Sequence, residues 1–129
     1  MCKFFLTLVL GFACASVQAE WTKVNEYAKS TVYVNLDKIQ RDDNLVKMWT
    51  MSDYKSPQHT SHKKLFRSIK SQAEYDCNAS TRRIVSTTHY SGKKGKGEVV
   101  YSNAYFDKPW LPVVNNDLES LELAFACKS

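Results

Sequence analysis

The chain has 129 residues, of which 43% are hydrophobic, 12% aromatic and 24% charged, with a formal net charge of +5. A length of this order accommodates one domain. The apolar and aromatic content excludes a disordered chain, and a content of four glycines and three prolines excludes a low-complexity linker protein.

Residues 1–19 have the three parts of a secretory signal peptide. Lys3 gives a positively charged start, residues 4–13 form an uncharged apolar run, and Ala19 ends a small-residue cleavage motif. The apolar run is too short for a membrane-spanning helix, which needs about 20 residues, and no later segment is apolar enough. We therefore expect an exported protein, periplasmic or secreted, with a single domain at residues 20–129.

Cys14 offers a second route of processing, because bacterial lipoproteins are cut just before a cysteine that then carries lipid. Phe12 stands where such a motif has a small residue, so cleavage after Ala19 is favoured. Lipidation at Cys14 is the alternative, and it would place the protein at the cell surface. Cleavage after Ala19 leaves 17 basic and 13 acidic residues, a net charge of +4.

The same cleavage leaves two of the four cysteines, Cys77 and Cys127. Two cysteines in an exported chain most simply form one disulfide. A metal-binding pair or a catalytic thiol is the alternative, and a separation of 50 residues without a nearby CxxC or CxH motif supports neither. We predict a structural disulfide.

The processed chain is expected to fold mainly as strands. Alternating, β-branched or aromatic runs cover residues 31–36, 45–54, 65–77, 83–90 and 98–106. A weaker run lies at 21–24, and the glycine-rich segment 91–97 is typical of a mobile hairpin loop. These runs predict an antiparallel β-meander of about five or six strands.

The C-terminal segment has a different pattern. Pro109 and Pro112 interrupt the strands, and residues 116–119 resemble a helix N-terminus with an acidic first turn. An apolar stripe then follows at Leu118, Leu121 and Phe125, which predicts a helix packed on one face of the sheet. The expected fold class is therefore α+β, with the disulfide joining the helix to the strand that ends at Cys77.

Several short motifs, taken in order, resemble the surface-adhesin protein E family of small exported proteobacterial proteins. They lie at Trp21, 34–39, 44–49, 53–54, 67–70, 74–77, 95–100, 109–113 and Cys127. The resemblance spans nearly the whole processed chain. It implies an antiparallel sheet with a packed C-terminal helix and a disulfide between them. It also implies a role in binding host extracellular-matrix proteins such as vitronectin or laminin, often as a dimer.

The basic residues of two segments form the candidate binding surface, with acidic glycans, lipid head groups or acidic protein segments as ligands. They are Lys63, Lys64, Arg67, Lys93, Lys94 and Lys96. The alternative is that they are ordinary solvated positions that keep an exported protein soluble, because a net charge of +4 does not identify a partner. We expect no nucleic-acid partner.

The run 45–54 carries apolar side chains on both sides, and one helix can cover only one of them. The other side requires a partner subunit, a loop or a ligand. Trp49 and Met51 are therefore the candidate interface residues, and the pattern is compatible with a homodimer.

Catalytic and metal-binding motifs are absent from the sequence. His59 and His62 would need a further ligand such as His89 to hold zinc, and His89 with Glu98 is the one pair that could act as acid and base in a small secreted hydrolase. We expect neither enzyme activity nor a cofactor. The predicted function is a non-catalytic binding or adhesion module, and the alternative is a soluble periplasmic binder of a small or acidic ligand.

Overall fold

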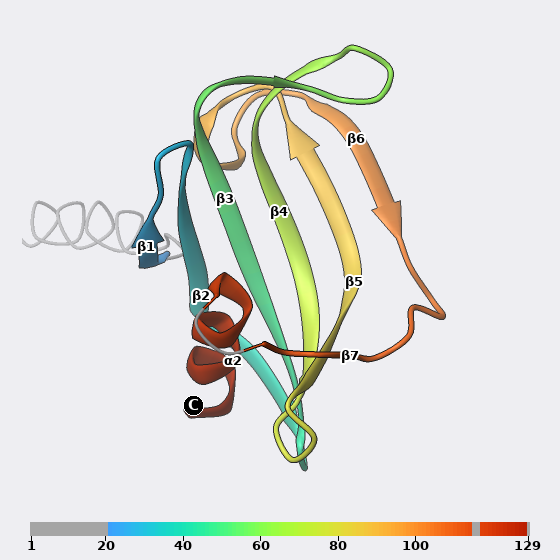
Figure 1. Ribbon diagram of the computed structural model, residues 1–129. Coiled ribbons are helices and arrows are strands. Elements are labelled where there is room, and N and C mark those ends of the chain that lie inside the picture. The colour runs from blue at the N-terminus through green and yellow to red at the C-terminus, as the bar shows by residue number, and fades with distance from the viewer. Residues whose placement is uncertain (1–20, 115–116, 129) are drawn as a thin grey trace, which may run out of the picture.

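The computed structural model describes residues 21–114 and 117–128, which fold around one antiparallel sheet (Figure 1). The signal peptide and the lipidation of Cys14 lie outside the described residues and stay predictions. Six strands follow one another across the sheet in chain order: β1 (Thr22–Glu26), β2 (Ser30–Asp42), β3 (Leu45–His59), β4 (Leu65–Asp76), β5 (Thr81–Tyr90) and β6 (Val99–Ala104). The predicted meander is confirmed, and a seventh strand, β7 (Leu111–Pro112), pairs with the start of β5.

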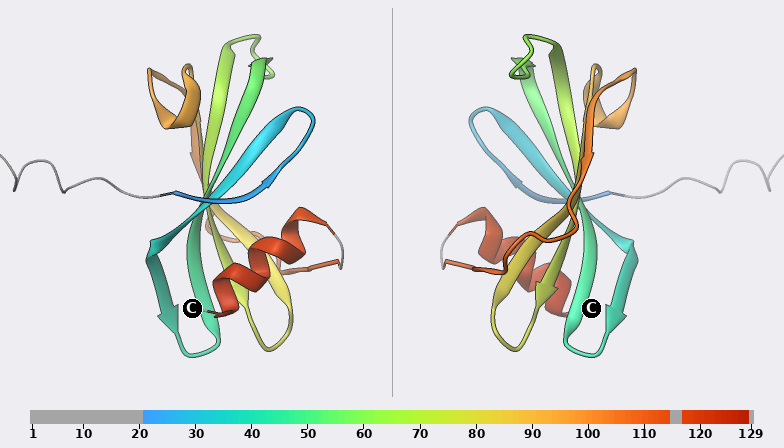
Figure 2. Two further views of the ribbon diagram at one scale, coloured as in Figure 1. Left: turned by 90° about the vertical axis from the view of Figure 1, so that its left-hand side faces the viewer. Right: turned by 90° about the vertical axis from the view of Figure 1, so that its right-hand side faces the viewer.

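The sheet is strongly twisted, so that its strands fan out on both sides of a narrow waist when it is seen edge on (Figure 2). Register shifts interrupt the β2–β3, β3–β4 and β4–β5 pairings. One of them, between Asp53 and Gln58 in β3, accommodates Pro57, which has no amide hydrogen for a regular ladder.

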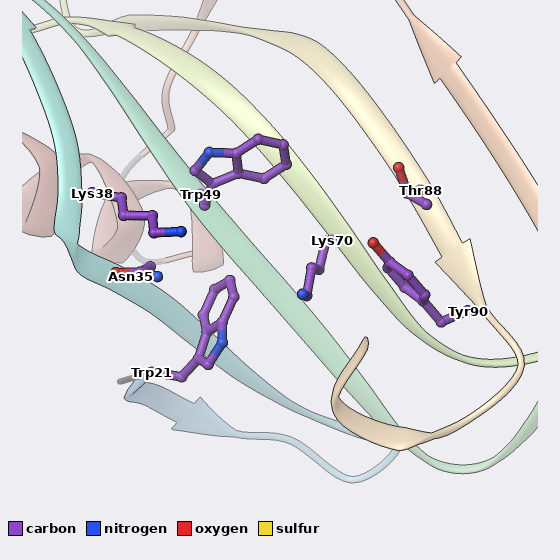
Figure 3. A pocket seen from close by; sticks show the side chains of 7 residues that line it. All are labelled: Trp21, Asn35, Lys38, Trp49, Lys70, Thr88 and Tyr90. Atoms are coloured by element: carbon purple, nitrogen blue, oxygen red, sulfur yellow. The ribbon is translucent and has the colours of Figure 1, made fainter. Parts of the chain in front are cut away.

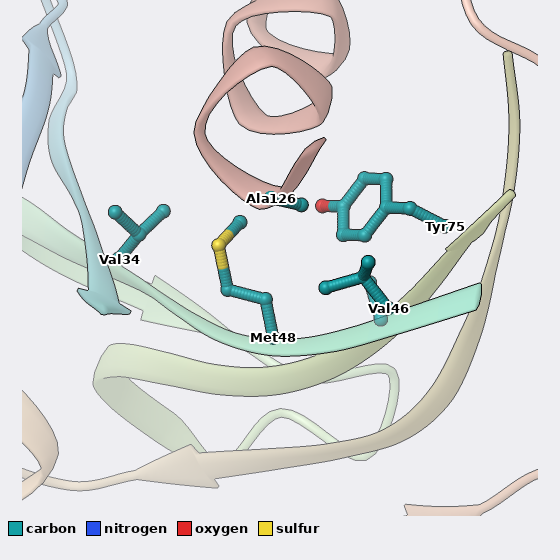
Figure 4. Close-up of a cluster of buried hydrophobic side chains, with 6 residues drawn as sticks. Val34, Val46, Met48, Tyr75 and Ala126 are labelled. Atoms are coloured by element: carbon teal, nitrogen blue, oxygen red, sulfur yellow. The ribbon is translucent and has the colours of Figure 1, made fainter. Parts of the chain in front are cut away.

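The two faces of the sheet are covered differently. The helix α2 (Leu118–Lys128) packs on one face, near the end where β2 meets β3 (Figures 1 and 2), and we call this the helix face. Its core consists of fully buried side chains at Val34, Val46, Met48, Ala73, Tyr75 and Ala126 (Figure 4). The opposite side, to which Trp49 and Met51 point, is called the open face.

The predicted disulfide is present. Cys77, in the turn after β4, is bonded to Cys127 in the last turn of α2, with their Cα atoms 5.7 Å apart. In the loop-entropy model a bridge that closes 50 residues stabilises the fold by about 4 kcal/mol. The bridge attaches the helix to the centre of the sheet.

The helix forms where it was expected but is rotated about its axis. Glu122 and Ala126 face the sheet with 5% and 0% of their surface exposed, while Leu121 is 39% exposed. The predicted stripe through Leu118, Leu121 and Phe125 was therefore wrong at Leu121.

No helix among the described residues is long and apolar enough to cross a membrane.

Candidate functional site

Three connections meet at one end of the sheet, because the turns of a meander alternate between its two ends. They are residues 27–29, 60–64 and 91–98, and we call them the loop end (Figures 1 and 2). They contain six lysines, Lys29, Lys63, Lys64, Lys93, Lys94 and Lys96, and one acidic residue, Glu98. The turns at the opposite end, 43–44 and 77–80, contain Asp43 and no basic residue. Positive charge in the turns is therefore concentrated at the loop end.

Five of the six predicted binding residues lie in these connections, in two separate groups. Lys63 and Lys64 are in the β3–β4 hairpin, and Lys93, Lys94 and Lys96 are in the β5–β6 connection. Among the described residues, none of these five side chains forms an ion pair. All five residues are exposed, so an acidic partner can reach them.

Arg67, the sixth predicted residue, has a structural role. It lies in β4, and its Nη2 donates hydrogen bonds to the carbonyl oxygens of Tyr54 and Lys55, at 3.5 and 3.1 Å. Those carbonyls lie in the stretch of β3 where the register with β4 shifts. Arg67 thus satisfies backbone groups that the neighbouring strand leaves unpaired.

The glycine-rich connection 91–98 is packed on the sheet, although its composition predicted a mobile loop. It contains the short 3-10 helix η1 (Lys93–Gly95). The amide of Lys94 donates to Asp53 Oδ1 at 2.9 Å, and the amide of Gly95 donates to Ser68 Oγ at 2.8 Å. Ser68 is fully buried and donates in turn to the carbonyl of Gly92 at 2.7 Å. Two strands of the sheet therefore hold the loop on the open face.

This loop covers Met51, one of the two predicted interface residues. Met51 is 1% exposed and lies between Tyr33 and Lys70 in the register of the sheet. The ammonium of Lys94 lies 5.6 Å from the ring centre of Tyr33. The sequence left a partner subunit, a loop or a ligand as possible covers for this side of β3. In the structure a loop of the chain itself covers Met51, so Met51 is not available to a partner. Trp49 is half-buried, and it is the candidate interface residue that remains for the expected homodimer.

Trp49 forms part of a hollow of about 300 Å³ on the open face (Figure 3). The residues that line it are three aromatic, two basic and two polar: Trp21, Trp49, Tyr90, Lys38, Lys70, Asn35 and Thr88. Trp21 precedes β1, and the others come from β2, β3, β4 and β5. The sequence alone did not connect these residues, because only the strand register places them side by side.

Lys70 is held in position at this hollow. Its ammonium lies 5.6 Å from the ring centre of Trp21 and 5.4 Å from that of Tyr90. Its aliphatic stem lies against Gly95, where φ is +72° and a β-carbon would fall 2.3 Å from Lys70 Cε. Cation–π contacts and the packed loop together fix where the charge is presented.

An acidic side chain, Glu122 of α2, is buried between the helix and the sheet. Burial raises the pKa of Glu122 to about 7, although the nearby Arg82 lowers it and Glu119 and Asp117 raise it further. Arg82 pairs with Glu119 at 3.1 Å. Burial also raises the pKa of Tyr75, while the nearby Arg82 acts in the opposite direction.

The histidines do not come together. The ring of His89 makes edge contacts with Phe66 and Tyr101, at centroid distances of 4.5 and 5.1 Å, and burial lowers its pKa. His59 and His62 lie at the β3–β4 hairpin, far from His89 in the strand pairing. In the part of the chain that the structure describes, no three His, Cys, Asp or Glu side chains are grouped to hold a metal ion. Among the same residues, His89 forms no hydrogen bond with Glu98, the pair considered as acid and base.

Comparisons with known proteins agree with this architecture. The family model "Surface-adhesin protein E" matches residues 21–128. Among solved structures, Haemophilus influenzae protein E superposes with a TM-score of 0.63 at 14% identity, covering 88% of this chain and 87% of that one. Its crystal form II gives 0.65 at 13%, with 88% and 91% covered. Protein E from non-typeable Haemophilus influenzae gives 0.60 at 14%, with 88% and 78% covered. No curated protein sequence matches the chain.

Proposed function

The chain belongs to the surface-adhesin protein E family, and from this premise we propose that it is an exported, non-catalytic adhesion module. The proposed partner is a host extracellular-matrix protein such as vitronectin or laminin. The proposed contact surface is the loop end, and the partner segment that it meets is acidic.

The concentration of lysines at the loop end carries this proposal. Six lysines and one glutamate occupy three connections that meet at one end of a rigid sheet. Clustered charge of one sign attracts an oppositely charged partner over several ångströms and raises the association rate, and salt weakens both effects. The anchoring of residues 91–98 by Asp53 and Ser68 supports the proposal, because a preorganised loop loses less entropy on binding.

Capture on immobilised vitronectin and laminin tests the proposal. The variant Lys93→Glu/Lys94→Glu should reduce capture at least about tenfold, since it reverses two charges at the loop end. A matched control, Lys108→Glu/Lys128→Glu, makes the same change of charge away from the loop end and should bind like the wild type. Equal losses in both variants would assign the effect to net charge, and no capture of either matrix protein would remove the adhesion proposal.

Export is tested separately by the mass of the protein recovered from cell fractions. A chain that begins at Glu20 and is recovered without lipid would agree with cleavage after Ala19. A lipid-modified Cys14 at the N-terminus would instead place the adhesin on the cell surface. A chain that retains residues 1–19 in the cytoplasm would contradict export.

A further inference from the structure

The hollow on the open face borders the loop end, where Lys70 lies against Gly95, and combines features that the adhesion proposal does not use. Its volume of about 300 Å³ is at the lower limit for small-ligand sites, which range over about 300–1,000 Å³. Apolar walls with a few convergent polar groups are typical of such sites. The hollow therefore suits a ligand of one or two rings.

Three aromatic side chains give the hollow flat apolar walls. Trp21 and Trp49 lie in its middle, one from each side of β2, while Tyr90 closes it at the end of β5 (Figure 3). Exposed indole rings present large apolar faces at low cost in conformational entropy. The C–H face of a sugar ring packs well against such a surface, and so does an aromatic ring.

Two ammonium groups make the hollow positive. Lys38 and Lys70 reach it from opposite sides, with the indoles between them (Figure 3). None of the described residues that line the hollow is acidic, and neither lysine forms an ion pair in the part of the chain that the structure describes. An anionic group on the ligand would satisfy these charges, and charge-assisted hydrogen bonds are about twice as strong as neutral ones.

Polar groups on the floor favour a hydroxylated ligand over a purely apolar one. Asn35 is 2% exposed, and its Oδ1 accepts a hydrogen bond from the amide of Asp37 at 3.0 Å. This bond orients the side chain so that its amide nitrogen is turned to the hollow (Figure 3). Thr88 adds a hydroxyl on the far side. Both side chains can form hydrogen bonds with the hydroxyl groups of a sugar ring. An aromatic carboxylate lacks such hydroxyl groups.

We propose that this hollow is a binding site for an acidic sugar, a pyranose ring that carries a carboxylate. Trp21 and Trp49 pack against the ring, Lys38 and Lys70 bind the carboxylate, and Asn35 and Thr88 bind hydroxyl groups. The residues that line the site lie outside the three connections of the loop end, so the proposal stands whether or not that end binds a matrix protein. Such sugars occur both in host glycosaminoglycans and in the bacterial cell wall.

Isothermal titration calorimetry on the protein purified from the exported fraction tests the site. The probes are a hyaluronan tetrasaccharide, which carries uronic acid, and the cell-wall disaccharide with muramic acid. Chitotetraose, a neutral sugar of similar rings, is the charge control. Saturable binding of one or both acidic probes, at least about tenfold tighter than chitotetraose, is expected, and the probe that binds identifies the source.

Variants assign the binding to the hollow. Lys70→Met keeps the aliphatic stem but removes the charge, and should weaken binding of the acidic probe at least about tenfold. Lys70→Arg should retain it. Trp21→Ala, at the edge of the fold, should also weaken binding, whereas Lys63→Glu/Lys64→Glu at the loop end should not. A melting temperature equal to the wild type shows that each variant is folded.

Two results would overturn the proposal. One is equal affinity for chitotetraose and the acidic probes, which would remove the role of the lysines. The other is the absence of binding heat for every acidic probe at about 1 mM, a concentration that detects even weak ligands. Loss of matrix-protein capture with retained sugar binding would contradict the adhesion proposal alone.

Discussion

Gly95 and the stem of Lys70 are in such close contact that no other residue fits at position 95 without moving the lysine. A β-carbon on Gly95 would lie 2.3 Å from Cε of Lys70, and the backbone there has φ of +72°. Position 95 therefore favours glycine for two reasons: the space beside Lys70 is small, and the backbone is left-handed.

Substitution of Gly95 by alanine should therefore destabilise the fold and displace Lys70. The left-handed conformation alone costs a non-glycine residue roughly 1–2 kcal/mol, which urea unfolding would detect. Lys96→Ala, in the same loop but exposed, is the control and should change stability by less than about 0.5 kcal/mol. Equal stability of Gly95→Ala and the wild type would contradict the left-handed backbone at this position.

The buried carboxyl of Glu122 should make stability fall as pH rises. Its pKa is about 7 in the folded chain and 4.5 in an ordinary environment. The folded state therefore holds the proton more tightly, so its stabilising effect is complete below about pH 4.5 and is lost progressively up to about pH 7. The loss amounts to roughly 3 kcal/mol for this group.

The variant Glu122→Gln isolates this contribution, because an amide keeps the shape and does not titrate. We expect the variant to be more stable than the wild type at pH 8, with a smaller difference at pH 5, measured by urea unfolding. The two proteins differ only at position 122, so the difference between their pH profiles reports on that side chain. An identical pH profile for the two would contradict a raised pKa at Glu122.

Removal of the disulfide should loosen the helix more than the sheet. Cys77→Ser/Cys127→Ser should lower the free energy of unfolding by about 2–4 kcal/mol. Hydrogen exchange should show amides of α2 losing protection while those of β3 and β4 keep theirs, because the strands are paired on both sides and the helix is not. Reduction of the wild type should reproduce the variant, and uniform loss of protection would contradict independent loosening of the helix.

Arg83 joins a buried acid to an aromatic ring. Its Nε and Nη2 donate to Glu74 Oε1 at 3.0 and 2.9 Å, and its guanidinium lies 4.3 Å from the ring centre of Trp110. Arg83→Met should destabilise by about 2 kcal/mol, since Glu74 is 8% exposed and would lose its partner. Adding Glu74→Gln should recover part of the loss in a double-mutant cycle, and additive effects would contradict the coupling.

The strands and the disulfide could be predicted from the sequence because both depend on local patterns. Residues 65–77 alternate with period two, and two cysteines in an exported chain have one simple pairing. The rotation of α2 could not be predicted, because the helix buries the acidic side chain of Glu122 together with Ala126 and leaves the apolar Leu121 39% exposed. A side chain such as Glu122 is an improbable core residue on composition alone.

The binding features depend on long-range register. Trp21, Trp49 and Lys70 are far apart in the chain, and only the pairing of β3 with β4 brings the last two onto neighbouring strands. The position of residues 91–98 depends likewise on Asp53 and Ser68, which nothing in the sequence marks as loop anchors. The basic residues could be chosen from the sequence, but the structural role of Arg67 could not.

The bond between Cys77 and Cys127 also determines how the protein responds to mechanical tension. A pull on the C-terminus passes through the sulfur atoms directly to the end of β4 in the middle of the sheet, and the 50-residue loop between the cysteines carries no load. In a single-molecule stretching experiment the oxidised protein should extend about 17 nm less than the reduced one, the contour length of that loop. Under tension the segment that the bond closes, about two-fifths of the chain, would thereby stay folded until the sheet itself comes apart.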